Sequence, residues 1–449
     1  MHEDTIAALA TPFGEGAIAV VRVSGPGAVG LGGRVLRAAR PVQDWQPRQA
    51  VRATVVTADG AGVDDVLATW FPAPASYTGE HVLEISGHGG VLVAQRVLAA
   101  VLAAGARPAE PGEFTQRAFL NGKLELTQAE AVMDLIQARS SLALAAAKQQ
   151  LDGALGRETM DLRASLIEVT AQLEAYIDFP EEDIDPDTGA SLTARIRAVL
   201  DRVGQLLATA DRGRILREGL STAIIGAPNV GKSSLLNYLC GEDRAIVSER
   251  PGTTRDTVET FINLRGVPLR LIDTAGLRES TDDIERLGME RSRAALAAAD
   301  LVLWVVDGSR PAAEAGAAPG HADHTNRLLV IHKSDLPRHD DWSGSDGVPV
   351  SSLRRTGVEQ LAERVRQLAL GSGAGIGSQL PAINARHQAC LGRARSALTA
   401  AVEAMEQGIE PEFVAADLRA AMTAIGEVTG RIDADEVLGE IFGRFCIGK

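Results

Sequence analysis

The chain has 449 residues, of which 45% are hydrophobic, 23% charged and 4% aromatic. This length exceeds what one hydrophobic core usually serves, and the composition excludes a disordered or collagen-like chain. The net charge of −14 gives no global attraction to nucleic acid, so an RNA contact would need a local basic patch or a partner protein. Three scattered cysteines, an acidic start and the lack of a long apolar run predict a cytoplasmic protein without disulfides or membrane contact.

The first 121 residues have the pattern of a mixed α and β domain. Residues 17–23 favour a strand and residues 92–103 a helix. From about 125 to 216, apolar residues recur at three- and four-residue steps, as they do on long amphipathic helices. The same pattern returns after a glycine-rich linker at 371–378.

Between the two helical parts, short buried strands alternate with helices. Strands are expected at 222–225, 269–272, 301–306 and 328–331, as in a parallel sheet that binds ligands at its carboxyl edge. Helical sequence on both sides predicts that this α/β segment is inserted in a helical domain. The predicted domains are 1–121 (N-terminal), 122–216 (helical, first part), 217–372 (inserted α/β) and 380–449 (helical, second part).

Residues 226–233 (GAPNVGKS) match the phosphate-binding pattern G-x-x-x-x-G-K-[ST] between a predicted strand and a predicted helix. The glycines let backbone N–H groups turn toward phosphate oxygens, Lys232 reaches the terminal phosphates, and the Ser233 hydroxyl binds Mg²⁺. A glycine-rich turn without a ligand is the alternative, which the flanking strand and helix disfavour. Asn229 can offer its side-chain oxygen to a monovalent cation, which would neutralise charge in the transition state.

Two further loops have the residues of a nucleotide switch. In residues 252–256 (GTTRD), Thr254 would complete the Mg²⁺ shell when GTP is bound, although this stretch alone could be a polar loop. Residues 273–276 (DTAG) follow a predicted strand, so that Asp273 can hold Mg²⁺ through water and the Gly276 N–H can contact a γ-phosphate.

The residue after the second loop excludes one common catalytic arrangement. Leu277 stands where GTPases of the Ras type carry a glutamine that orients water, and leucine cannot orient water. Glu285 lies just beyond and could position water. The residues alone leave open whether it does so or lies on a solvated helix face.

Residues 332–335 (HKSD) predict guanine as the base. The Asp335 carboxylate can accept from the N1–H and the exocyclic amine of guanine, whereas adenine would leave it unpaired. Lys333 can lie along the base plane. The usual pattern is N-K-x-D, and with His332 in place of asparagine we expect a donor to guanine N7 but a weakened tether to the phosphate loop. Residues 351–353 (SSL) depart slightly from the S-A-[KL] loop that touches guanine O6.

Together these residues resemble the MnmE (TrmE) family of tRNA-modification GTPases, and the resemblance runs the whole length of the chain. Outside the nucleotide motifs it rests on four parts, of which the last two are foreign to generic GTPases. They are 4–8 (DTIAA) with 22–25 (RVSG), 77–80 (YTGE) through 87–90 (GHGG), 111–124 (PGEFTQRAFLNGKL), and 445–449 (FCIGK).

The resemblance implies a multidomain fold: an α+β N-terminal domain that dimerises and binds folate, an all-α helical domain, and an inserted α/β P-loop GTPase domain. It implies a homodimer that forms a heterotetramer with an FAD-dependent partner, MnmG (GidA). On tRNA, the pair would add an aminomethyl or carboxymethylaminomethyl group to C5 of the wobble uridine. The implied cofactors are GTP, Mg²⁺, K⁺ and 5-formyltetrahydrofolate or a related one-carbon folate.

The resemblance also implies site residues, carried over motif by motif. GTP would be bound by Asn229, Val230, Gly231, Lys232, Ser233, Ser234, Ser248, Glu249, Arg250, Pro251, Gly252, Thr253, Thr254, Asp273, Thr274, Ala275, Gly276, Lys333 and Asp335. Mg²⁺ would be held by Ser233 and Thr254, and K⁺ by Asn229, Ser248, Arg250 and Thr253. Folate would contact Arg22, Glu84, Lys123 and Lys449. The implied catalytic residues are Glu285, Arg255 and Cys446, the last with a buried helix-end thiol as its alternative.

Two other functions compete with tRNA modification. A ribosome-assembly GTPase of the Era or Der kind would share the phosphate loop and the cation chemistry, but would need an RNA-binding module, usually basic. A nucleotide-gated scaffold would hydrolyse GTP without further chemistry, and would need no folate.

Overall fold

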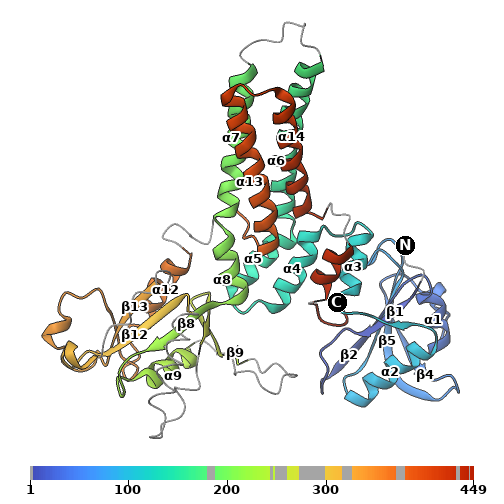
Figure 1. Ribbon diagram of the computed structural model, residues 1–449. Coiled ribbons are helices and arrows are strands. Elements are labelled where there is room, and N and C mark those ends of the chain that lie inside the picture. The colour runs from blue at the N-terminus through green and yellow to red at the C-terminus, as the bar shows by residue number, and fades with distance from the viewer. Residues whose placement is uncertain are drawn as a thin grey trace. The chain divides into compact units, whose positions relative to one another are not determined.

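The computed structural model describes residues 4–178, 188–242, 246–247, 260–272, 299–315, 326–370, 380–430, 435–443 and 445–449. The chain divides into two compact units, Met1–Met133 with Gly426–Lys449, and Asp134–Ile425 (Figure 1). Among the described residues, no helix combines the length and the apolar character needed to cross a bilayer.

The first unit is built on a seven-stranded sheet in the order β3-β4-β5-β6-β2-β1-β7, antiparallel except for the parallel pair of β1 and β7. Its strands are β1 (Ile6–Leu9), β2 (Ile18–Ser24), β3 (Leu36–Ala38), β4 (Ala50–Val56), β5 (Gly62–Phe71), β6 (Val82–His88) and β7 (Arg107–Pro108). The helices are α1 (Ala28–Val35), η1 (Val42–Asp44), α2 (Val91–Ala103), α3 (Glu113–Leu120) and α15 (Asp435–Phe442). Alternate residues of the strands, such as Val21 and Val23, are buried in one core with residues of α1 and α2.

Residues 445–449 pack against the beginning of α3. The N–H of Gly112 donates to the carbonyl of Cys446 at 3.4 Å, and the N–H of Phe114 donates to the main-chain oxygen of Lys449 at 3.2 Å. Gly448 has a φ of +97°, and a Cβ there would lie 2.3 Å from the carbonyl oxygen of Leu9. Only glycine fits this close approach, so the last residues of the chain are fitted closely to the first strand.

A buried arginine fixes α3 to the sheet. The Arg117 guanidinium is fully buried and donates to Glu113 at 2.8 Å, one turn earlier on α3, and to Glu80 at 3.2 Å. It also reaches Asp4 at 2.8 Å, while Arg107 pairs with Glu113 at 2.6 Å. Because buried charges are costly unless they are paired, this network specifies how α3 packs.

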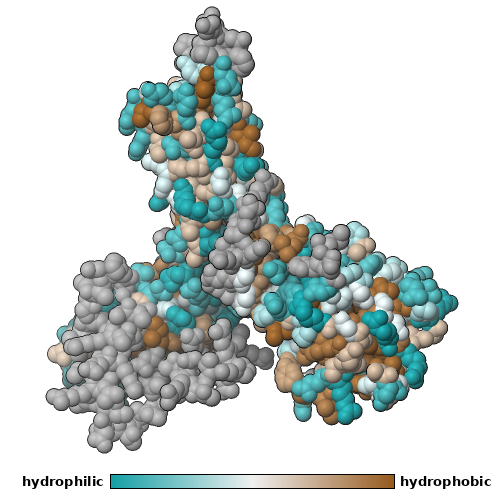
Figure 2. All heavy atoms as spheres, turned by 45° about the vertical axis from the view of Figure 1, so that its right-hand side comes forward, coloured by the Kyte–Doolittle hydropathy of each residue, from teal (hydrophilic) through white to brown (hydrophobic). Residues whose placement is uncertain are grey.

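Helices from both sides of the α/β segment pack together in the second unit. Here α7 lies along α6 and α13, and Figure 1 shows α6, α7, α13 and α14 as one bundle. The helices are α4 (Leu126–Gln137), which begins in the first unit, α5 (Ser141–Leu151), α6 (Ala154–Asp178), α7 (Thr188–Leu207), α8 (Ala210–Glu218), α13 (Ala385–Gln407) and α14 (Pro411–Val428). On the face shown in Figure 2, the bundle carries isolated brown patches among teal side chains, as expected for helices with one buried face.

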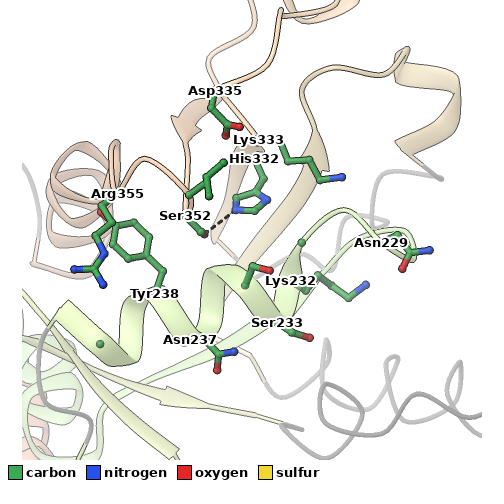
Figure 3. Close-up of a pocket in the computed structure, with 14 residues that line it drawn as sticks. Asn229, Lys232, Ser233, Asn237, Tyr238, His332, Lys333, Asp335, Ser352 and Arg355 are labelled. Atoms are coloured by element: carbon green, nitrogen blue, oxygen red, sulfur yellow. Dashed lines mark hydrogen bonds between the residues drawn. The ribbon is translucent and has the colours of Figure 1, made fainter.

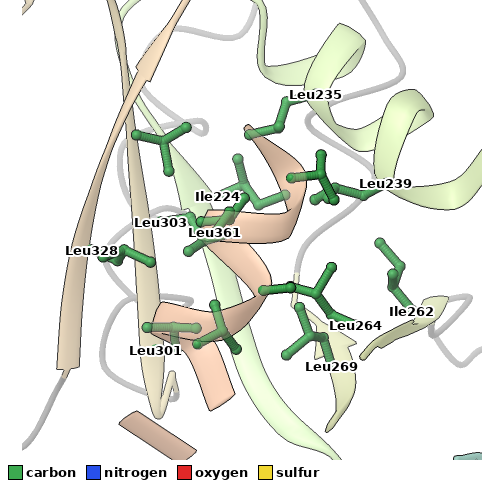
Figure 4. Packing of buried hydrophobic residues seen from close by; sticks show 14 of the residues in the cluster. Ile224, Leu235, Leu239, Ile262, Leu264, Leu269, Leu301, Leu303, Leu328 and Leu361 are labelled. Carbon is green, nitrogen blue, oxygen red and sulfur yellow. The ribbon is translucent and has the colours of Figure 1, made fainter. Parts of the chain in front are cut away.

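The α/β segment forms a seven-stranded sheet in the order β14-β13-β12-β8-β11-β10-β9. The first five of these are parallel, β10 pairs antiparallel with β11, and β9 pairs antiparallel with β10. The elements are β8 (Leu220–Ile225), α9 (Lys232–Glu242), β9 (Ile246–Val247), β10 (Thr260–Leu264), β11 (Val267–Leu271), β12 (Leu301–Asp307), η2 (Ala312–Ala315), β13 (Asn326–His332), η3 (Asp340–Trp342), β14 (Val348–Val350) and α12 (Val358–Leu370). Leucines of α9 and α12 pack with Ile224 and Leu303 of the sheet (Figure 4). The predicted fold class, including the inserted α/β domain, is confirmed; the predicted linker at 371–378 lies outside the described residues.

The α/β segment begins and ends at the same place on the bundle. Thr209, just before α8, donates from its hydroxyl to the carbonyl of Pro381 at 3.0 Å. Arg217 near the end of α8 donates to the carbonyl of Ile383 at 2.7 Å. A Cβ on Gly213 would lie 2.2 Å from that same carbonyl, so the two chain segments are in close contact.

Candidate functional site

The phosphate loop joins the end of β8 to the first residue of α9, as its sequence predicts. Gly231 has a φ of +99°, a conformation that side chains rarely adopt, and a Cβ there would lie 2.3 Å from His332 Nδ1. Asn229 also has a positive φ of 64°. The loop therefore has the backbone turn that phosphate cradles need, and α9 begins directly after it.

Lys232 is the first residue of α9, and its side chain contacts the phosphate loop. Its ammonium donates to the carbonyls of Gly226 and Ala227, both at 2.9 Å. Burial lowers the pKa of Lys232 below its usual value, because the charged form is poorly solvated there. A terminal phosphate at this position would supply the negative charge that the ammonium lacks.

A pocket of about 850 Å³ brings the phosphate loop and the base-recognition residues together. Asn229, Lys232 and Ser233 line it from the loop and α9, and Lys333 and Asp335 line it from the segment after β13 (Figure 3). The pocket lies at the carboxyl edge of the parallel strands, where open α/β sheets bind ligands.

Asp335 and Lys333, the residues expected to recognise the base, are each oriented by a neighbour that was not predicted as their partner. The Ser351 hydroxyl donates to Asp335 at 2.5 Å and lowers the pKa of that carboxyl. Lys333 Nζ donates to Asp307 at 2.7 Å. Burial alone would raise the pKa of Asp307, but hydrogen bonds from Lys333 and Ser309 lower it. Asp307 could have been found, since it ends β12 at the ligand-binding edge.

His332 differs from what its sequence suggests. Its Nδ1 lies 2.9 Å from the carbonyl oxygen of Val230, so the ring is tethered to the phosphate loop by a hydrogen bond. Its Nε2 lies 2.8 Å from the Ser352 hydroxyl, so both ring nitrogens have a partner within the protein, whereas the sequence predicts a donor to guanine N7 (Figure 3).

Many predicted nucleotide, cation and catalytic residues lie outside the described residues. They are Ser248, Glu249, Arg250, Pro251, Gly252, Thr253, Thr254, Arg255, Asp273, Thr274, Ala275, Gly276 and Glu285, together with Leu277. Both switch loops and the predicted catalytic glutamate therefore remain predictions.

Two of the four predicted folate contacts pair directly in the first unit. Arg22 of β2 donates to Glu84 of β6 at 2.9 Å, and the two residues are cross-strand partners. The guanidinium also lies near the rings of Tyr77 and Phe114, at 5.7 and 5.6 Å from their centroids. These two aromatic contacts were missed by the sequence reasoning, because they join residues far apart in the chain.

The last residues of the chain reach the same place. Arg22 donates to the carbonyl of Gly448 at 3.3 Å, next to Lys449. Lys123 donates to the carbonyl of Pro74 at 3.2 Å and is not joined to Arg22 by a direct contact among those described. Cys446 is exposed, which excludes the buried thiol considered as its alternative.

Comparison with known proteins covers both units. The family profile "GTP-binding protein TrmE N-terminus" matches residues 5–123, and "MnmE helical domain" matches residues 126–446. Among solved structures, the G domain of the T. maritima FeoB iron transporter is 25% identical, over 33% of this chain and 97% of that chain, with a TM-score of 0.22, too low to add to the assignment.

Curated relatives match over the full length. A protein named tRNA modification GTPase MnmE from Akkermansia muciniphila is 52% identical over 100% of this chain and 99% of its own. Proteins of the same name from Geobacter sulfurreducens and Roseiflexus castenholzii are 46% and 45% identical, each over 100% of this chain and over 99% and 100% of their own lengths. The chain therefore belongs to the MnmE family of tRNA modification GTPases.

Proposed function

We propose that this chain hydrolyses GTP in the modification of the tRNA wobble uridine. The proposal of GTP hydrolysis is supported by one pocket that is lined by both the phosphate loop and Asp335. Asp335, oriented by Ser351, would accept from the two N–H groups of guanine that adenine lacks. Lys232 would leave the loop carbonyls for the β- and γ-phosphates.

Two metal ions would complete the hydrolytic site. Ser233 at the start of α9, with Thr254, has the hydroxyl chemistry that Mg²⁺ prefers, and Mg²⁺ would bridge the phosphates. Asn229, with Ser248, Arg250 and Thr253, would hold K⁺, which would neutralise charge that develops as the γ-phosphate leaves. Glu285 would orient the attacking water, since Leu277 cannot.

Folate binding and the chemistry on the uridine would involve residues of the first unit. Arg22, which pairs with Glu84 and donates to the Gly448 carbonyl, would bind a one-carbon folate together with Glu84, Lys123 and Lys449. The exposed Cys446 would take part in the chemistry on the uridine. A homodimer would act with the FAD-dependent MnmG (GidA) to form the aminomethyl or carboxymethylaminomethyl group.

GTP hydrolysis in KCl and in NaCl at equal ionic strength tests the cation site. We expect a K⁺-specific acceleration that is lost in Asn229→Ala. Asn326→Ala is the matched control, because Asn326 is exposed at the opposite end of β13. Equal rates of the unmodified protein in both salts would refute the K⁺ site, while hydrolysis itself would still stand.

Folate binding separates this function from ribosome assembly and from a scaffold. Titration calorimetry with 5-formyltetrahydrofolate should give a binding isotherm that Arg22→Met abolishes. Arg52→Met is the control, since Arg52 lies in the same sheet with 81% of its side chain exposed. Absence of binding by the unmodified protein would favour the ribosome-assembly or the scaffold alternative.

Opening and closing of paired G domains would couple hydrolysis to the distant chemistry. Spin labels at the exposed position 360 on α12 would report the distance between the two G domains of a homodimer. This distance should shorten when a transition-state analogue of GTP hydrolysis binds. A distance that stays constant through the GTP cycle would refute the coupling.

A further inference from the structure

His332 lies between two loops that serve different parts of a nucleotide. It is the last residue of β13 and is 4% exposed. On one side its Nδ1 meets the carbonyl of Val230 in the phosphate loop at 2.9 Å. On the other its Nε2 meets the hydroxyl of Ser352, in the loop after β14, at 2.8 Å. One imidazole ring thus spans the pocket wall from the phosphate side to the base side (Figure 3).

The two partners determine the tautomer of the ring. A carbonyl oxygen can only accept, so Nδ1 carries the hydrogen and donates to Val230. In the neutral ring Nε2 then accepts, and the Ser352 hydroxyl is the donor. Burial lowers the pKa of His332 and so favours the neutral ring. The hydrogen bond to the Val230 carbonyl opposes this shift, as do Asp335 and Asp307, whereas Lys333 lowers the pKa further.

Ser352 stands next to the residue that orients the base-recognition carboxylate. Ser351 donates to Asp335 at 2.5 Å, and the main-chain N–H and carbonyl of Ser351 pair with Thr356 in an isolated bridge. Holding Ser352 therefore also holds the segment from which Asp335 is oriented. With Gly231 packed directly against the ring, the phosphate loop cannot shift without moving His332.

We propose that His332 is a positioning residue that joins the phosphate loop to the base-recognition loop, and that it makes no contact with guanine N7. The inference rests on the proposed guanine-nucleotide function of this pocket and specifies how the pocket is held together. Guanine selectivity then depends on Asp335 alone among the residues of the HKSD segment. The ring stabilises a pocket in which phosphate and base sites are already aligned, which strengthens binding by lowering the cost of ordering.

Binding of GDP and of 7-deaza-GDP, in which a C–H replaces N7, tests the contact with the base. Dissociation constants are measured by calorimetry with Mg²⁺ for the unmodified full-length protein and for His332→Ala. We expect the ratio of the two constants to be the same in both proteins, within about twofold. If His332 donated to N7, the unmodified protein would bind 7-deaza-GDP about 5- to 10-fold more weakly than GDP, and His332→Ala would remove that difference. Such a result would overturn the proposal.

A double-mutant cycle tests the joining of the loops. His332→Ala should weaken GDP binding about 5- to 30-fold, because both hydrogen bonds of the ring are lost. Ser352→Ala should weaken it less, and the double variant should bind within about twofold of His332→Ala, because both changes remove the same bond. Affinity losses that simply multiply in the double variant would refute the coupling between the loops.

His332→Asn guards against a variant that fails to fold. An asparagine amide can still donate to the Val230 carbonyl, so this variant should bind GDP more tightly than His332→Ala, and equally weak binding would refute the tether. His339→Ala is the control, since His339 is a half-exposed histidine a few residues further along, with 38% of its side chain exposed. Failure of the unmodified protein to bind GDP would refute the proposed function itself, whereas tight GDP binding with an N7 penalty that His332→Ala removes would refute this inference only.

Discussion

Replacing Arg117 by methionine should unfold the first unit locally, and the structure sets the size of the effect. The arginine side chain is fully buried, and its partners Glu80 and Glu113 are only 8% and 7% exposed. The variant leaves both carboxylates without this cation, although Arg107 still pairs with Glu113. Removing one partner of a buried ion pair costs about 3–5 kcal/mol, and the half-exposed Asp4 adds little to this.

Hydrogen exchange gives a measurement confined to one unit. Because each 1.36 kcal/mol is a factor of ten, amide exchange in β6 should accelerate about 10²- to 10⁴-fold in Arg117→Met. Exchange in β12, which lies in the second unit, is the reference within the same molecule and should not change. Arg52→Met is the matched control, since its pair with Asp65 is exposed to solvent and contributes little to stability. Arg117→Lys keeps a charge and should have a smaller effect if Arg117→Met does not fold.

The stability loss caused by Arg117→Met should depend on pH. Burial alone would raise the pKa of Glu113, but hydrogen bonds from Arg107, the Glu110 N–H and Arg117 lower it below its usual value. A carboxyl with a depressed pKa stabilises the fold above its unfolded pKa of about 4.3, and this contribution is lost as the pH falls through the folded pKa. The deficit of Arg117→Met should therefore shrink between pH 7 and pH 3.5. A deficit below about 1 kcal/mol at pH 7, or one that is independent of pH, would refute this account.

Three further outcomes are expected. Gly448→Ala should release residues 445–449 from β1, because the new Cβ would lie 2.3 Å from the Leu9 carbonyl oxygen. Limited proteolysis should then cleave these residues faster. Gly439→Ala is the control and should leave them protected, because a Cβ at position 439 would meet no atom within 4 Å. Gly231→Ala should lower GDP affinity more than 100-fold, on the order of 3 kcal/mol, because the new Cβ would overlap the His332 ring and strain a positive φ; near-normal affinity in calorimetry would contradict this. Burial lowers the pKa of His332, so the neutral ring stabilises the fold fully above a pH of about 6.5, and this stabilisation is lost as the pH falls through the folded pKa. Thermal unfolding of the second unit should therefore show a larger loss of stability between pH 7.5 and 5.5 in the unmodified protein than in His332→Asn.

Local chemistry made much of the second unit predictable. The phosphate loop was placed correctly between β8 and α9, because a glycine-rich turn after a buried strand has few other structures. The strands at 301–306 and 328–331 were predicted because each is a short, almost continuous apolar run. The observed β12 is one residue longer than predicted, and β13 is two residues longer at its start and one at its end.

Contacts between distant residues could not be predicted in the same way. The second hydrogen bond of His332 depends on where the loop after β14 brings Ser352, 20 residues further along. The contact of Arg22 with Gly448 joins residues 426 positions apart. From the sequence alone, Arg117 would be predicted to lie on a solvent-exposed helix face, because the spacing of Glu113 and Arg117 does not indicate that both are buried. Each of these depends on tertiary packing, which local propensity does not encode.

The contacts of Thr209 and Arg217 with Pro381 and Ile383 bring the two ends of the α/β segment together on the helical bundle. A short peptide could therefore join residue 218 to residue 381 without stretching the chain. The nucleotide domain is in this sense removable: the gene could have acquired it by a single insertion into an ancestral bundle, and an engineer could exchange it for another domain whose termini lie equally close. The helical scaffold would keep its continuity through α8 and α13 whatever switch was placed between them.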